Sequence, residues 1–187
     1  AIQMYAGANS LTIGTSGGGV SKTSPEIIAA NGYAINKFEG EINFYDGIIK
    51  GSKGACQFKG ESVACSSIIT GYETSYELYE GVEDSYNVAY LYLPVAEDGS
   101  GNKYETLSDA IAAVTTGTIT MVRDTSECVT IASGKTITLD LNGKTITCSA
   151  GTAITNNGTL EITGSGEVKT ASGEGNIILT NNGTLNL

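Results

Sequence analysis

The residues that could do chemistry in this chain are carboxylates, tyrosines and cysteines, because its 187 residues include no histidine. Without imidazole, neither a Ser-His-Asp nor a Cys-His nucleophile can form, and zinc sites that need imidazole are excluded too. Twenty Asp and Glu outnumber ten Lys and Arg, and the net charge of -10 disfavours binding to nucleic-acid phosphates. We therefore expect no cofactor, no metal and no nucleic-acid partner.

Carboxylates leave open two ways of cleaving polysaccharides. Glycoside hydrolysis needs a pair of them, which any two of Asp46, Asp124, Asp140 and Glu161 could supply. A lyase needs a basic residue to abstract a proton, and Arg123, next to Asp124, is the only arginine. A solvated pair that ends a strand is the better interpretation of these two neighbours. We expect no catalytic residues, and a polysaccharide lyase or glycoside hydrolase is the alternative.

Six of the ten tyrosines gather within about twenty residues, among five acidic residues. Tyrosine rings can stack on sugar rings, and carboxylates accept hydrogen bonds from sugar hydroxyls. The candidate ligand-binding residues are Tyr72, Glu73, Tyr76, Tyr79 and Tyr86, with Tyr90, Tyr92, Glu77, Glu80, Glu83 and Asp84 nearby. The competing interpretation is a tyrosine-rich strand or hairpin that closes the end of a repeat structure, kept soluble by its acids.

One acidic stretch resembles a calcium-binding loop in the spacing of its oxygen ligands. Lys103 stands where such a loop needs glycine for its sharp turn, so we predict no metal site there. The oxygen-bearing residues are Asp98, Ser100, Asn102, Tyr104, Thr106 and Asp109.

The four cysteines lack a Cys-x-x-Cys pair, which makes zinc improbable and disulfides the better expectation in an oxidising compartment. A two-residue hairpin turn at Gly60-Glu61 would set Lys59 opposite Ser62 and Cys56 opposite Cys65. That non-hydrogen-bonded pairing brings the Cα atoms to about 4.5 Å, which suits a bridge. We predict a Cys56–Cys65 disulfide.

Cys128 and Cys148 lie about one repeat apart and leave two possibilities open. Cys148 shares the inward parity of Ile146, whereas Cys128 is out of phase with Val129 and Ile131. We expect a buried thiol as readily as a bond, and small hydrophobic residues filling gaps is an alternative for all four cysteines.

A repeat in the sequence predicts the elements that must position these residues. The stretch 156–162, NNGTLEI, returns as 181–187, NNGTLNL, a step of about 25 residues that is typical of a solenoid. The Asn-Gly pairs predict corners with positive φ, and the alternation that follows predicts strands with Leu160, Ile162, Leu185 and Leu187 inside. Stacked asparagines could hydrogen-bond in a ladder at these corners. We predict an all-β fold, a right-handed parallel β-helix.

Two segments are expected, separated by a linker. Residues 1–93 show strand-like runs bounded by Gly, Asn and Ser, and residues 94–103 have linker composition. Residues 104–187 begin with an amphipathic helix near 106–114, for which Thr106 and Asp109 supply a capping pattern. Such a helix would cover the open end of the first coil.

A longer similarity relates the segments, because residues 9–17 parallel residues 157–166. The chain thus contains a little over one copy of a unit of roughly 150 residues. The first segment corresponds to the later coils of such a unit and the second to its capped beginning.

Three runs carry a resemblance to a known family: YETLSDAI at 104–111, GTITMV at 117–122 and ITLDLNGKTI at 137–146. They resemble the capped start of the parallel β-helix repeats, similar to the pectin-lyase fold, in large surface proteins of Gram-positive, often gut-dwelling, bacteria. The resemblance implies an extracellular, wall-attached setting and an adhesive or glycan-facing role, with host or microbial glycans or surface proteins as partners. It brings no catalytic residues.

We therefore expect a non-catalytic stalk or adhesin segment, cell-wall or cell-surface attached as part of a longer exported protein. The longest apolar run, residues 89–96, is broken by Pro94 and is too short to cross a membrane, so we expect no membrane insertion by this segment. An enzyme of this fold would show carboxylates and cations converging in a groove. A stalk would show Thr, Asn and Ser facing out evenly.

Overall fold

The computed structural model describes residues 2–5, 7, 10–16, 24–72, 75–171 and 175–187. It divides into two compact units, residues 1–93 and 94–187, at the boundary predicted for the first segment. The described parts of the chain form stacked parallel coils of a β-solenoid, about seven turns in all, which confirms the predicted fold class.

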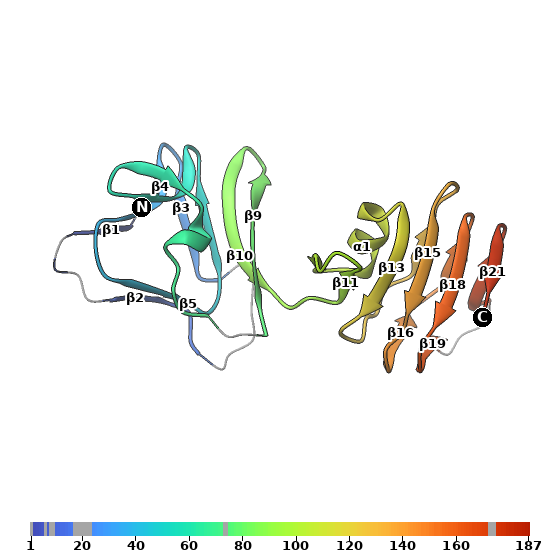
Figure 1. Cartoon of the computed structure of the whole chain (residues 1–187). Coiled ribbons are helices and arrows are strands. Elements are labelled where there is room, and N and C mark those ends of the chain that lie inside the picture. Colours follow the sequence, from blue (N-terminus) through green and yellow to red (C-terminus); the bar gives the residue numbers. More distant parts are fainter. Residues whose placement is uncertain (1, 6, 8–9, 17–23, 73–74, 172–174) are drawn as a thin grey trace. The chain divides into compact units, whose positions relative to one another are not determined.

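In the first unit, three parallel ladders make the walls of the coils (Figure 1). Their parallel registers bring residues from successive coils side by side, so the buried side chains stack along the interior. The ladders are β1 (Ile2–Met4), β4 (Tyr33–Lys37) and β7 (Gly54–Phe58); β2 (Ser10–Ile13) and β5 (Glu41–Phe44); and β3 (Glu26–Ala29) and β6 (Ile48–Gly51).

Two antiparallel hairpins complete the first unit. Strand β8 (Glu61–Val63) folds back on β7 and leads into the short 3-10 helix η1 (Cys65–Ser67). Strand β10 (Tyr86–Tyr92) runs antiparallel to β6, and β9 (Glu77–Glu83) runs antiparallel to β10. The tyrosine-rich segment is therefore largely a hairpin added to one wall of the coils.

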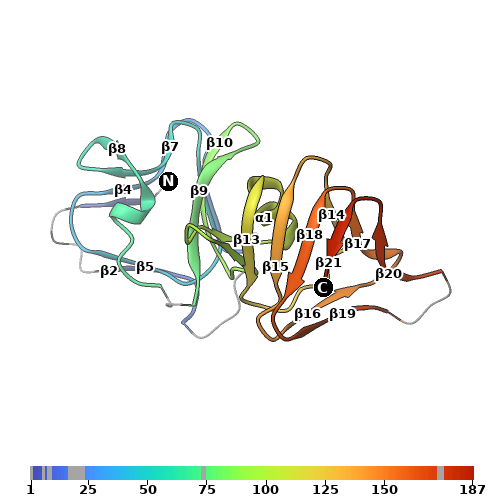
Figure 2. The same ribbon diagram turned by 45° about the vertical axis from the view of Figure 1, so that its right-hand side comes forward.

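The second unit repeats one coil design more regularly. Figure 1 shows β13, β15, β18 and β21 side by side, and the turned view in Figure 2 also labels β14, β17 and β20. The walls are β13 (Thr116–Met121), β15 (Thr136–Asp140), β18 (Thr159–Thr163) and β21 (Thr184–Asn186); β14 (Val129–Ile131), β17 (Thr152–Asn156) and β20 (Ile177–Asn181); and β16 (Lys144–Cys148) and β19 (Gly166–Thr170).

The predicted 25-residue step appears in two walls. Leu160 pairs with Leu185, and Ile154 pairs with Leu179. In the wall that begins with β13 the earlier steps are shorter, since Thr116 pairs with Thr136 and Thr136 with Thr159, steps of 20 and 23 residues. Leu160 is fully buried, Ile162 and Leu185 pack against the core, and Glu161 is exposed, as predicted. The prediction for Leu187 is wrong: it is 91% exposed, because it follows the last residue of β21 and has no partner strand.

The predicted helix is α1 (Leu107–Ala113), and Thr106 caps it as expected. The Thr106 hydroxyl accepts a hydrogen bond from the Asp109 backbone N–H at 2.9 Å and donates one to the Asp109 carboxylate at 2.6 Å. Leu107, Ala110 and Ile111 are buried in the core of the second unit, so the helix covers the apolar end of the first coil.

The predicted linker, residues 94–103, is instead part of the second unit. Strand β11 (Ala96–Asp98) pairs antiparallel with β13 and with β12 (Lys103–Tyr104), and Ala96 is fully buried. The Gly-, Ser- and Asn-rich residues between β11 and β12 form the turn of this hairpin. The hairpin thereby covers the strand edge of β13, which would otherwise be open to pairing with another chain.

At the Asn-Gly corners the backbones of neighbouring coils approach each other closely. Neither Gly158 nor Gly183 has the positive φ that was predicted. A Cβ atom at Gly183 would lie 2.0 Å from the Gly158 carbonyl oxygen, and one at Gly158 would lie 2.6 Å from the carbonyl oxygens of Ala132 and Lys135. Glycine is required there because successive corners stack directly on one another.

The asparagine ladder forms at the same corners. The side-chain amide of Asn156, fully buried, donates to the Asn181 side-chain oxygen at 2.7 Å, and that of Asn182 donates to the Asn157 side-chain oxygen at 2.9 Å. Asn156 also donates to the Thr184 carbonyl at 2.8 Å. These bonds satisfy polar groups that would be expensive to bury alone.

Candidate functional site

The tyrosine cluster divides into an inward and an outward part. Tyr79 lies directly opposite Tyr90 in the β9–β10 hairpin, and their rings stack with centroids 4.7 Å apart. Tyr86 and Tyr79 are half-buried and pack against a small core of Ile48, Val88 and Tyr90. Their ring faces contact protein, so this part of the cluster closes the hairpin against its sheet.

The outward part is a shallow depression of about 440 Å³ lined by Ile69, Thr70, Tyr72, Tyr76 and Glu77. Tyr72 is 38% exposed, whereas Tyr76 is only 9% exposed. Glu73 lies outside the described residues. The structure therefore brings Tyr72 and Tyr76 together and places Tyr79 and Tyr86 elsewhere.

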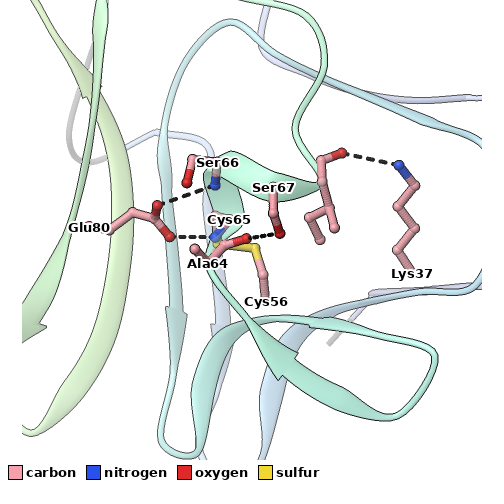
Figure 3. The surroundings of a disulfide bond; sticks show 8 residues. Lys37, Cys56, Ala64, Cys65, Ser66, Ser67 and Glu80 are labelled. Atoms are coloured by element: carbon pink, nitrogen blue, oxygen red, sulfur yellow. Dashed lines mark hydrogen bonds between the residues drawn. A yellow bond between two sulfur atoms is a disulfide. The ribbon is translucent and has the colours of Figure 1, made fainter.

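Glu80, an acid of the same cluster, has a structural role. Figure 3 shows its carboxylate reaching from β9 to the start of η1, where it accepts hydrogen bonds from the backbone N–H groups of Cys65 and Ser66. The buried Lys37 ammonium donates to the Ile68 carbonyl at 3.1 Å, just beyond the same short helix. Both charged side chains fix the segment that follows β8.

The predicted Cys56–Cys65 disulfide is present, with Cα atoms 5.2 Å apart, but the predicted register is wrong. Phe58 pairs with Glu61 and Cys56 with Val63, so the turn residues are Lys59 and Gly60, both with positive φ. This turn type needs positive φ at both positions, which Gly60 supplies easily. Cys65 lies two residues beyond the partner of Cys56, in η1, and reaches back to it.

Cys128 and Cys148 also form a disulfide, with Cα atoms 4.9 Å apart. The predicted parity is confirmed, because Cys148 is fully buried, Val129 is buried and Cys128 is exposed. The bond therefore joins the outside of one coil to the inside of the next. Each unit thus contains one disulfide, and the described residues contain no free cysteine.

Asp98 uses its carboxylate to hold the β11–β12 turn. It accepts hydrogen bonds from the Ser100 and Asn102 backbone N–H groups, from the Asn102 side-chain amide at 2.9 Å and from the Tyr104 hydroxyl at 2.8 Å. The bonds from the side chains of Asn102 and Tyr104, in that order of effect, lower the pKa of Asp98 from 3.8 to about 2. Four of the oxygen-bearing residues of the calcium-like spacing are thus bonded to one another in a turn.

Glu127 joins the first coil to the beginning of α1. Its carboxylate accepts from the backbone N–H groups of Leu107 and Ser108, and from the hydroxyls of Ser108 and Thr125 at 2.7 Å. Burial alone would raise its pKa, but the bonds from Ser108, Thr125 and Leu107 together outweigh that effect and leave the pKa lowered. At the other end of α1, the Lys135 ammonium donates to the carbonyls of Ala112 and Val114. These charges match the helix dipole at both ends.

Lowering the pH should weaken the second unit through Asp98 and Glu127. Both pKa values are depressed in the folded state, so their stabilisation is complete above the usual values of 3.8 and 4.5 and is lost as pH falls below them. We expect Glu127→Gln to be less stable at pH 7 and to lose less stability between pH 6 and pH 3. Urea midpoints measured across this range test the prediction, and an unchanged pH dependence would contradict it.

The other candidate carboxylates also serve turns and neighbouring strands. Asp124 accepts from the Thr145 backbone N–H at 2.8 Å, and Asp140 accepts from the Asn142 backbone N–H at 2.9 Å in the turn after β15. Glu161 accepts from the Thr138 hydroxyl at 3.1 Å. The described residues contain no group of three or more Cys, Asp or Glu placed to hold a metal ion.

The outward face of β13, β15, β18 and β21 carries threonine in ranks. One rank consists of threonine in all four strands, at 116, 136, 159 and 184. The next rank contains Thr118, Thr138, Glu161 and Asn186, in register. Short, mostly uncharged polar side chains therefore cover this wall evenly.

Comparison of the chain with models of protein families, with curated proteins and with solved structures found no significant match. Among the described residues, no helix is long and apolar enough to cross a membrane. Function must therefore be inferred from the geometry of the chain itself.

Proposed function

We propose that this chain is a non-catalytic module of an extracellular protein, a stalk or adhesin segment attached to the cell surface. The observation that carries the proposal is the even outward face of the second unit, where Thr, Asn and a single Glu fill two ranks across four strands. A parallel solenoid with such a face extends by adding coils, which is what a spacer between a cell wall and a partner requires.

The use of the carboxylates supports a structural role. Each of four carboxylates accepts hydrogen bonds from backbone N–H groups of a turn, of the helix start or, for Asp124, of strand β16; the other three are Asp98, Asp140 and Glu127. A hydrolytic pair would instead have to face each other across a substrate, about 5 to 10 Å apart. These acids are engaged in holding the coils.

The two disulfides support the extracellular setting. Disulfides persist in oxidising compartments and are rare where glutathione keeps thiols reduced. Here each unit has one, and in both cases it joins neighbouring segments of the solenoid. Exported domains commonly gain resistance to unfolding in this way.

The partners of such a module would be host or microbial glycans or surface proteins. Of the tyrosine-rich cluster, Tyr72 and Tyr76 line the shallow depression, and Tyr72 has a partly exposed ring. Binding there would be weak, since a shallow depression buries little of a ligand.

Catalysis by a lyase or hydrolase is the outcome that would refute this proposal. We expect pectin, xylan and chitin incubated with the protein, with and without calcium, to release neither unsaturated sugars nor new reducing ends. Absorbance near 235 nm and a reducing-end assay follow the two products. If the wild-type protein releases a product and Asp124→Asn or Arg123→Gln does not, the module is an enzyme.

A further inference from the structure

A second aromatic surface lies on the outer face of β1, β4 and β7, away from the tyrosine-rich hairpin. The parallel register aligns Gln3 with Asn36 and Asn36 with Gln57 in one row of amides. Two residues further along, backbone hydrogen bonds from Phe38 to Met4 and from Lys59 to Lys37 continue the register. A second row therefore contains Tyr5, Phe38 and Lys59.

The side chains of both rows point outward. Gln3, Tyr5 and Lys59 are exposed, whereas the alternating residues Met4, Ile35, Lys37 and Cys56 are buried inside the coil. We call this outer face of three strands the amide–aromatic face, with Gln3, Tyr5, Asn36, Phe38, Gln57 and Lys59 as its members.

The two rings on this face are nearly parallel, and that of Tyr5 is exposed while that of Phe38 is half-buried. Tyr5 and Phe38 have ring centroids 6.3 Å apart and an angle of 11° between their planes. Tyr5 is 64% exposed, although its hydroxyl donates to the Gln3 side-chain oxygen at 2.7 Å. The ring is therefore held in position while much of its surface remains accessible to a ligand.

The polar groups beside the rings are neutral amides, and one is incompletely bonded. The side-chain oxygen of Asn36 is buried and has no hydrogen-bond partner among the residues that the structure describes. A buried acceptor without a donor is uncommon and costly.

We propose that the amide–aromatic face binds a neutral saccharide. The apolar face of a sugar ring matches the exposed Tyr5 ring, and sugar hydroxyls match amides, which both donate and accept. The row of amides is neutral, and the one charged member of the face, Lys59, has its ammonium over the Phe58 ring at 5.2 Å from the centroid. An uncharged ligand therefore matches the amides and the Tyr5 ring. The inference rests on the extracellular setting proposed above, where the module meets glycans.

Titration with neutral tetrasaccharides tests this inference. The probes are cellotetraose, xylotetraose and mannotetraose, followed by NMR chemical shifts of the protein. We expect at least one of them to bind wild type with a Kd on the order of 1 mM, and Tyr5→Ala to weaken binding about tenfold. Tyr5→Phe should bind nearly as wild type, because the ring is retained.

Ile28→Ala is the matched control, since it removes an exposed apolar side chain of the same unit from β3, outside both candidate surfaces. We expect it to bind as wild type. Tyr72→Ala tests the depression beside Tyr76 as the alternative location of the site. Loss of binding in Tyr72→Ala with retention in Tyr5→Ala would overturn the inference and move the site to the depression beside Tyr76. Failure of all three probes to bind wild type would also overturn the inference. The proposed attachment to the cell surface would be unaffected, because labelling of intact cells tests it separately. Tyr5→Ala should remain folded, which thermal unfolding checks.

Discussion

Leu160→Asp should unfold the second unit or lower its free energy of unfolding by about 4 kcal/mol or more. Leu160 is fully buried, and its strand lies between Ile137 of one coil and Leu185 of the next. The described core around Leu160 consists of hydrophobic side chains, so a carboxylate there must be buried unpaired or must break the stack. Urea unfolding followed by circular dichroism measures the loss.

Thr118→Asp is the control for this substitution. It introduces the same carboxylate into the same ladder of strands, but at an exposed, outward-facing position. We expect a change within about 0.5 kcal/mol, as for most surface substitutions. Equal losses in the two variants would mean that the facing of the strands is wrong.

Unfolded, unreduced protein should contain no free thiol. Both cysteine pairs are bonded, so a thiol reagent should count zero groups before reduction and four after it. Two free thiols before reduction would mean that only one of the two disulfides forms, and four would mean that neither forms.

Removing a bridge should also lower stability considerably. Replacing both Cys128 and Cys148 by alanine should cost about 3 kcal/mol, because the bond closes a segment with a sequence separation of 20 in the unfolded chain. The Cys56 and Cys65 pair, with a separation of 9, should cost somewhat less. Comparison of the urea midpoints of the two double variants with wild type gives both numbers. A change below about 1 kcal/mol in both variants would contradict a stabilising role.

Local signals in the sequence were sufficient for much of the second unit. The period-2 alternation around Leu160 and Leu185 gave the facing of two strands, and Thr106 with Asp109 gave the start of the helix. These features depend on residues close together in the chain. Alternation failed at Leu187, where no strand pairing remains to bury the side chain.

Contacts between distant residues were not accessible in the same way. Glu127 caps a helix that begins twenty residues earlier, and Glu80 caps η1 fifteen residues before it. No local pattern marks either glutamate, because the fold alone brings it to the helix. The hairpin register failed for a related reason: Lys59 adopts a positive φ that lysine rarely adopts, and this shifts the turn by one residue.

The tyrosines show the same limit for the candidate site. Composition identified a cluster, but the pairing of Tyr79 with Tyr90 and the packing of Tyr86 depend on β10 joining β6. Conversely, Tyr5 and Phe38 are 33 residues apart and become neighbours only through the β1–β4 register. Spacing in the sequence gave no signal for that surface.

Labelling of intact cells tests the central claim of a surface module most directly. Antibodies raised against this segment should stain unpermeabilised cells of the source organism, and treatment of those cells with an external protease should abolish the signal. The same antibodies should detect the protein in the cell-wall fraction. Staining that appears only after permeabilisation, with the antigen protected from external protease, would contradict the account.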